Sequence, residues 1–85
     1  MLLTLVKTEA VVVENQNVEV RFFERRTTRG ERRYSAEILI GPGDCIILDG
    51  DSVITLETKA SRLVPATLYS RMLARATAAP RGLPP

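Results

Sequence analysis

The chain has 85 residues, of which 45% are hydrophobic and 26% charged, and its formal net charge is +2. These values predict one small soluble domain and argue against wholesale disorder. One cysteine and no histidine exclude an internal disulfide and a structural zinc site, so we expect no cofactor. No apolar run approaches the roughly 20 residues of a membrane span, and the apolar start is too short for a signal-peptide core. We therefore expect a cytoplasmic protein that does not contact membranes.

Charge is segregated along the chain. Residues 1–20 carry −2 and residues 34–58 carry −5, whereas residues 21–33 carry +4 and residues 59–85 carry +5. Blocks of opposite sign can pair within one chain, pair between subunits or form separate faces. The charge pattern leaves these three arrangements open.

The first half of the chain predicts strands joined by short turns. Residues 3–13 are rich in Val, Leu and Thr and lead into a polar turn at residues 14–17. Apolar and charged side chains then alternate over residues 18–22, which is the two-residue period of a half-buried strand. Residues 27–30 predict the next turn, because Gly30 can adopt a positive φ without steric cost.

The middle of the chain predicts three more strands. Residues 34–40 place their apolar side chains on one face, and residues 41–44 contain the proline-glycine pair of a type II turn. The apolar residues 45–48 and 53–58 predict two further strands, separated by a hairpin turn at residues 49–51. We therefore predict a mainly β protein, a five-stranded antiparallel meander or small barrel with one C-terminal α-helix.

The apolar period changes near the C-terminus. Pro65 is a favourable first helical residue, and the stripe that follows it predicts a helix over about residues 65–78. The stripe consists of Leu68, Tyr69, Met72, Leu73 and Ala76. We expect this helix to cover the core of a single domain, residues 1–79, followed by a loose tail at residues 80–85. In the alternative, the helix packs on a partner, and Arg71, Arg75 and Arg81 reach an anionic surface.

Six arginines gather where the second strand should turn into the third: Arg21, Arg25, Arg26, Arg29, Arg32 and Arg33. A guanidinium group presents a planar fork of donors that suits phosphate or carboxylate. A two-stranded ribbon fits a major groove or lies across a phosphate backbone. Two other interpretations stay open. Either Glu24 and Glu31 pair with neighbours while the other charges are solvated, or the turn docks on the acidic block of another subunit.

One short stretch resembles a known family. Residues 42–44 (Pro-Gly-Asp), an apolar strand and an Asp-Gly turn resemble the C-terminal hairpin of the AbrB/SpoVT swapped-hairpin DNA-binding family. In that family a stretch containing Thr or Ser and Gly precedes the hairpin, and residues 27–30 would stand in for it. Residues 34–40 are too few for the loop and helix that the family carries there. We therefore interpret residues 41–44 and residues 49–51 as turns.

Little in the sequence supports catalysis. Without histidine the usual base at neutral pH is missing, and residues 41–43 lack the helix and Lys-Ser/Thr pair of a phosphate-binding loop. Cys45 lies in an apolar run, where burial would make it unreactive. Asp49 and Asp51 supply too few oxygens for a calcium site.

We therefore predict a non-catalytic binding protein that contacts an anionic partner through the six arginines, with nucleic acid as the favoured partner. The alternative is a small accessory protein with complementary acidic and basic faces. Such a protein would assemble as a homo-oligomer or on a protein partner. Neither function requires a small-molecule cofactor.

Overall fold

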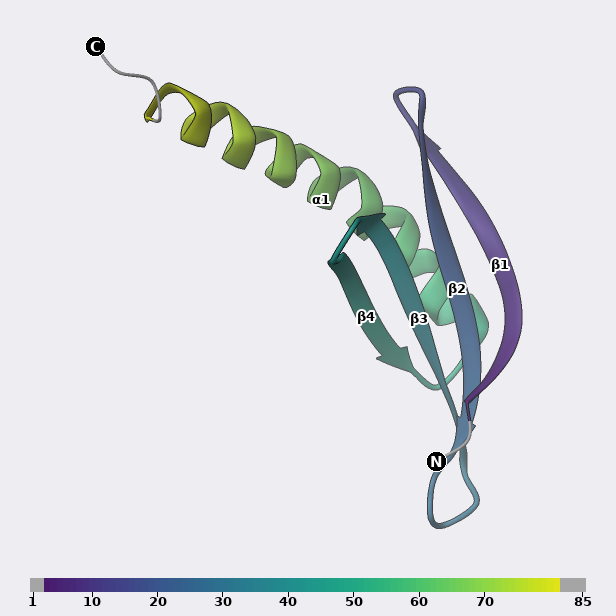
Figure 1. The fold of residues 1–85 in the computed structure, drawn as a ribbon. Coiled ribbons are helices and arrows are strands. Elements are labelled where there is room, and N and C mark those ends of the chain that lie inside the picture. The colour runs from purple at the N-terminus through teal and green to yellow at the C-terminus, as the bar shows by residue number, and fades with distance from the viewer. Residues whose placement is uncertain (1–2, 82–85) are drawn as a thin grey trace.

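The computed structural model describes residues 3–81, with side chains for residues 3–76. The elements follow the order β1 (Leu3–Val13), β2 (Gln16–Arg26), β3 (Arg32–Gly41), β4 (Asp44–Gly50) and α1 (Val53–Arg81). The strands form one antiparallel sheet in chain order, and α1 crosses one face of it before extending past its edge (Figure 1). The mainly β class and the C-terminal helix are confirmed. The sheet is open and has four strands, so the fifth strand and the closed barrel are wrong predictions.

The three turns within the sheet lie where the sequence predicts them. Glu14 and Asn15 have φ values of 47° and 68°, as both central residues of a type I′ hairpin turn require. Gly30 follows at φ 84°, and Gly43 at φ 71° occupies the third position of a type II turn after Pro42. The residue types at these positions therefore predicted all three turns correctly.

The core lies between α1 and the face of the sheet that it covers, which we call the helix-side face. Alternation along the strands and a 3.6-residue period along α1 bring the buried side chains together. The core consists of Val18, Val20, Phe22, Ala36, Ile38, Leu56, Ala60 and Val64, all at most 2% exposed. The opposite face of the sheet has no covering element among the described residues, and we call it the open face.

The helix α1 begins at Val53 and not at Pro65, so residues 53–58 are helical and not a strand. Ser52 caps the helix, because its Oγ accepts a hydrogen bond from the Thr55 amide at 3.1 Å and its carbonyl accepts one from the Leu56 amide at 3.2 Å. Gly50, expected in a hairpin turn, instead ends β4 close to the helix. A Cβ at Gly50 would lie 3.2 Å from a methyl carbon of Leu56.

The helix also runs further than predicted. Pro65 lies in its interior on an exposed position, where it supplies no N–H for the carbonyl four residues earlier. The helix continues to Arg81, so residues 80–81 of the expected tail are helical, and residues 82–85 lie outside the described residues. No helix in the described part of the chain is long and apolar enough to cross a membrane.

Cys45 is exposed, which corrects the expectation that its apolar run would bury it. Only the helix-side face of the sheet is covered, so every second residue of β4 points away from α1. Ile46 and Leu48 pack against the core, whereas Cys45, Ile47 and Asp49 belong to the open face.

Candidate anion-binding hairpin

The β2–β3 hairpin extends past β4 and past the described part of β1. Leu3 is the first described residue of β1 and lies opposite Arg25, and Gly50 at the end of β4 lies opposite Tyr34. Residues 26–32 therefore form a two-stranded ribbon with a loop at its end, which we call the hairpin end (Figure 1).

The loop of the hairpin end is closed by three hydrogen bonds around Thr27. The Gly30 amide donates to the Thr27 carbonyl at 2.9 Å, and the Thr27 amide donates to the Glu31 carbonyl at 2.9 Å. The Glu31 amide donates to the Thr27 hydroxyl at 3.2 Å. This is a type I turn followed by a left-handed glycine, a common three-residue hairpin loop. It holds the loop in one conformation and presents Arg29 at the tip.

The strand register sets arginine opposite arginine twice in succession. Arg25 lies opposite Arg33, and Arg26 lies opposite Arg32. Like charges in directly opposite positions of an antiparallel pair destabilise the pair. The register thus sets four of the six arginines in two facing pairs.

The carboxylate of Asp49 offsets the repulsion between Arg25 and Arg33. Arg25 donates from Nη2 to Asp49 Oδ1 at 2.6 Å, and Arg33 donates from Nη2 to Oδ2 at 3.1 Å. Hydrogen bonds from the two guanidinium groups, first Arg25 and then Arg33, lower the pKa of Asp49. One carboxylate of β4 thus bridges two arginines on the open face.

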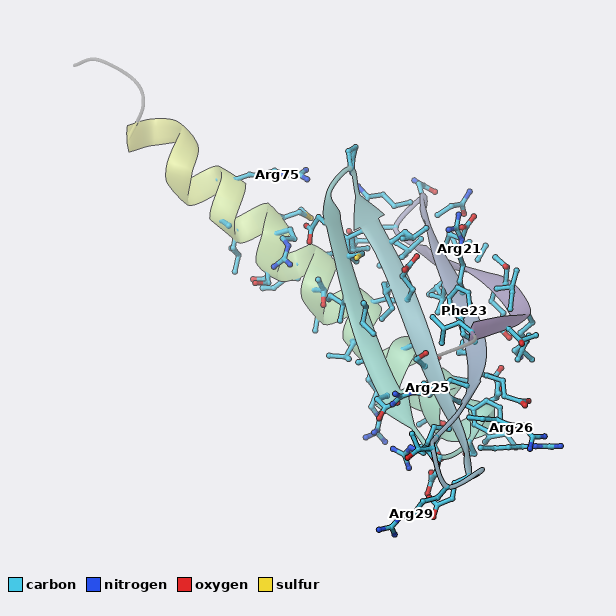
Figure 2. All side chains as sticks on the ribbon, turned by 60° about the horizontal axis from the view of Figure 1, so that its bottom comes forward. Arg21, Phe23, Arg25, Arg26, Arg29 and Arg75 are labelled. Carbon is cyan, nitrogen blue, oxygen red and sulfur yellow. The ribbon has the colours of Figure 1, made fainter. Side chains whose placement is uncertain are left out.

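The repulsion between Arg26 and Arg32 is compensated much less. Arg32 Nε lies 3.8 Å from Glu24 Oε1, and the Arg32 side chain is 61% exposed. Within the described side chains, no carboxylate lies within 4.0 Å of a cationic nitrogen of Arg26 or Arg29, and Glu31 forms no ion pair. Figure 2 shows Arg26 and Arg29 projecting away from the ribbon. Arg26, Arg29 and Arg32 are therefore available to an external anion.

Arg21 lies apart from the hairpin end. Its Nε is 2.5 Å from Glu19 and its Nη1 is 3.7 Å from Glu37, so it belongs to a row of ion pairs on the open face. The structure thus divides the six predicted site residues into three sets. The first set is Arg21 alone, and the second is the pair bridged by Asp49, Arg25 and Arg33. The third set is the exposed arginines of the hairpin end: Arg26, Arg29 and Arg32.

The acidic block at residues 34–58 is largely paired within its own chain. Four of its five acids contact cations: Glu37, Asp44, Asp49 and Glu57. Asp51 forms no ion pair with any described side chain.

Arg71 fixes α1 to the sheet. It donates from Nε to Asp44 Oδ2 at 2.8 Å and from Nη2 to Oδ1 at 3.1 Å. The paired hydrogen bonds lower the pKa of Asp44 and raise that of Arg71, and the charge of Arg75 lowers the Asp44 pKa further. The contact lies at the β3–β4 turn, where α1 leaves the sheet. In one alternative, Arg71, Arg75 and Arg81 were expected to reach an anionic surface. Arg71 instead pairs with Asp44 of its own chain, and the side chain of Arg81 is not described.

No protein family, curated protein or solved structure matches this chain. No group of three or more acidic or thiol side chains in the described residues could hold a metal ion. The chemistry that the geometry of the hairpin end offers is charge-assisted hydrogen bonding to an anion from a narrow, projecting ribbon.

Proposed function

We propose that this protein is a non-catalytic nucleic-acid-binding protein whose hairpin end contacts phosphate groups. The observation that carries the proposal is the pair of successive arginine-on-arginine positions in the β2–β3 register. Such an arrangement costs stability in the free protein. Phosphates between the guanidinium groups would remove the repulsion and form charge-assisted hydrogen bonds.

The shape of the hairpin end favours a nucleic acid. The ribbon of residues 26–32 extends past β4 and past the described part of β1, and a projecting two-stranded ribbon fits a major groove. Arg26, Arg29 and Arg32 contact phosphates in this proposal. Arg25 and Arg33, held by Asp49, flank them on the open face, and Arg21 adds positive charge further along β2.

The pairing of the acidic block weighs against the alternative, assembly through complementary charged faces. A neighbouring subunit would need free carboxylates to receive the hairpin end. Four of the five acids in residues 34–58 already contact cations of their own chain. Exchanging these contacts for equivalent ones between subunits would gain little.

The test is a binding titration of fluorescent duplex DNA and single-stranded RNA at two salt concentrations. The variant R26A/R29A should lose at least about tenfold in affinity at low salt. Its slope of log affinity against log salt on duplex DNA should be shallower by about 1.8, since each phosphate contact contributes about 0.9.

The matched control is K59A/R62A, which removes the same amount of charge from exposed positions on α1. It should bind almost as tightly as the wild-type protein. Equal losses in the two variants would show that net charge alone drives binding. Binding to polyglutamate but not to either nucleic acid would favour an acidic protein partner. Either result would contradict the proposal.

A further inference from the structure

A groove opens where α1 separates from the sheet, at the end of the molecule opposite the hairpin end (Figure 1). One part of the groove, of about 530 Å³, lies between α1 and the β1–β2 turn. Its apolar lining consists of Val13, Pro65, Leu68, Tyr69 and Met72. A second part, of about 290 Å³, adjoins it, because Gln16, Leu68 and Met72 line both. The larger part alone is within the range of roughly 300–1,000 Å³ that is typical of small-molecule sites.

The helical wall of this groove is apolar. Pro65, Tyr69 and Met72 recur at i, i+4 and i+7, so they lie on one side of α1 in successive turns. The buried hydrophobic core ends at Val64 on this helix, whereas Tyr69 is 63% and Met72 is 53% exposed. The wall therefore offers apolar surface that the folded chain does not cover with its own described residues.

The second part of the groove is polar and carries positive charge. Its polar lining consists of Gln16, Asn17, Arg71 and Arg75. Asp44 already holds Arg71 through hydrogen bonds of 2.8 and 3.1 Å. Arg75 forms no ion pair with any described side chain, and Figure 2 shows it extending from α1 on the side of the sheet. An exposed guanidinium beside two side-chain amides supplies several donors for a planar anion such as a carboxylate.

The two parts of the groove carry opposite charges. Glu14 lines only the apolar part, and Arg75 lines only the polar part. An anionic group is therefore attracted to the Arg75 end and repelled from the Glu14 end, which gives a ligand one favoured orientation. One guanidinium without an ion pair matches a single negative charge. A phosphate monoester would bring about −1.5 to −2 and exceed it.

We propose that this groove binds an amphiphilic monocarboxylate, a molecule with one carboxylate and an unbranched alkyl chain of medium length. The carboxylate accepts hydrogen bonds from Arg75, and the alkyl chain lies along Met72 and Tyr69 toward Pro65. The helix rises by about 15 Å between Pro65 and Arg75, a length that such a chain spans when extended. The flexible side chain of Met72 can adapt to its shape.

The groove is open to solvent along one side, so it covers only part of such a ligand. We therefore expect a dissociation constant on the order of 100 µM. This proposal does not rest on nucleic-acid binding, because Arg26 and Arg29 lie at the other end of the sheet.

The first test is calorimetric titration of the protein with dodecanoate below its micellar concentration. The wild-type protein should bind, and R75A should bind at least about fivefold more weakly because the carboxylate loses its donor. The matched control is R62A, which removes the same charge from an exposed position of α1 outside the groove. It should bind as the wild-type protein does. Circular dichroism establishes that both variants fold. Absence of binding by the wild-type protein at about 1 mM dodecanoate overturns the proposal.

The second test reverses the charge of the ligand. Dodecyltrimethylammonium carries the same alkyl chain and a cationic group, so it should bind the wild-type protein at least about tenfold more weakly than dodecanoate. R75A should reduce this difference to less than about threefold. Equal binding of the two ligands to the wild-type protein would show that the groove selects an alkyl chain alone, and it would refute the carboxylate site.

The third test locates the ligand and its orientation by NMR of the ¹⁵N-labelled protein. Dodecanoate should shift the amide signals of residues 13–17 and 66–75. A dodecanoate with a nitroxide on its last carbon should broaden the signal of Ala66 more than that of Arg75, because the alkyl chain points away from Arg75. The opposite order, or shifts confined to the open face, would contradict the proposal.

The rival occupant is a second copy of the chain. Tyr69 and Met72 can pack against the same side chains of another α1, although this brings the arginines of the two helices together. Sedimentation of the wild-type protein should show a monomer across a range of concentrations. A dimer that Y69E/M72E makes monomeric would show that a second copy occupies the groove, and it would refute the proposal.

The two proposals can fail separately. R75A should bind duplex DNA almost as tightly as the wild-type protein, and R26A/R29A should bind dodecanoate as the wild-type protein does. Lost nucleic-acid binding with dodecanoate binding intact in R26A/R29A supports both proposals. Weaker dodecanoate binding by R26A/R29A would mean that the net charge of the protein, and not Arg75, attracts the carboxylate. That result would overturn the groove proposal alone.

Discussion

The middle of the molecule and its two projecting ends are stabilised differently. In the middle, Leu56, Ala60 and Val64 of α1 are buried against β2 and β3. At one end the hairpin end sets arginines against one another, and at the other end α1 leaves the sheet with Tyr69 and Met72 exposed. Stability should therefore come from the middle, whereas the ends present groups that the folded chain does not use for its own packing.

The largest effect should follow from a change in the middle. Leu56 is fully buried, so L56A should lower the free energy of unfolding by about 2–5 kcal/mol through lost burial and a residual cavity. Ile54, two residues earlier on the same helix, is 76% exposed, and I54A should change the stability by less than about 0.5 kcal/mol. Urea unfolding measures both variants. Similar losses in the two would mean that α1 packs differently from the arrangement described.

An intermediate effect is expected at Pro65, between the packed and projecting parts of α1. A proline inside a helix costs about 3 kcal/mol of stability. Replacing it with alanine gives the unfolded chain more conformational freedom, which lowers the stability by about 0.4–1 kcal/mol. P65A should therefore raise the free energy of unfolding by about 2–2.6 kcal/mol. The control P80A, in the last turn of α1, should have a smaller effect because helix ends fray. Destabilisation by P65A would indicate that the helix needs its proline to follow the sheet.

Local turn chemistry made much of the sheet predictable. Residue type alone indicated the turns at Gly30 and Gly43, which have positive φ, and the alternation along β2. Together these signals predicted four strands and the position of the arginine hairpin. The boundary between β4 and α1 was predicted wrongly, because Val53, Ile54 and Thr55 are β-branched and favour strands. Tertiary packing of Leu56 outweighed that preference.

The signal for the correct start of the helix was nevertheless present. Ser52 is a favourable cap, and Leu56, Ala60 and Val64 recur at four-residue intervals, which a strand would not place on one face. Pro65 favours a helix that begins at residue 65, because proline usually begins a helix and seldom lies inside one. The partners of the arginines could not be read from the sequence, because Asp49 meets Arg25 and Arg33 only through the β3–β4 register.

The smallest effect on stability should come from the hairpin, at Asp49. D49N removes the charge that bridges Arg25 and Arg33, but the Asp49 side chain is 46% exposed, so the loss should be below about 1 kcal/mol at neutral pH. The pKa of Asp49 is lowered in the folded state, so its contribution is present above the ordinary value of 3.8 and is lost as the pH falls through the folded pKa. The difference in unfolding free energy between wild-type protein and D49N should therefore vanish in acid.

The same substitution should strengthen nucleic-acid binding. Without the carboxylate, Arg25 and Arg33 can turn toward phosphate, and the net charge of the protein rises by one. We expect D49N to bind duplex DNA several-fold more tightly at low salt and to show a steeper salt dependence. D51N alters the net charge equally at an acid that forms no ion pair in the described part of the chain, and it should change affinity much less. Equal gains in D49N and D51N would mean that the bridge plays no part in recognition. A gain confined to D49N would show that the carboxylate stabilising the hairpin also restrains the arginines that bind.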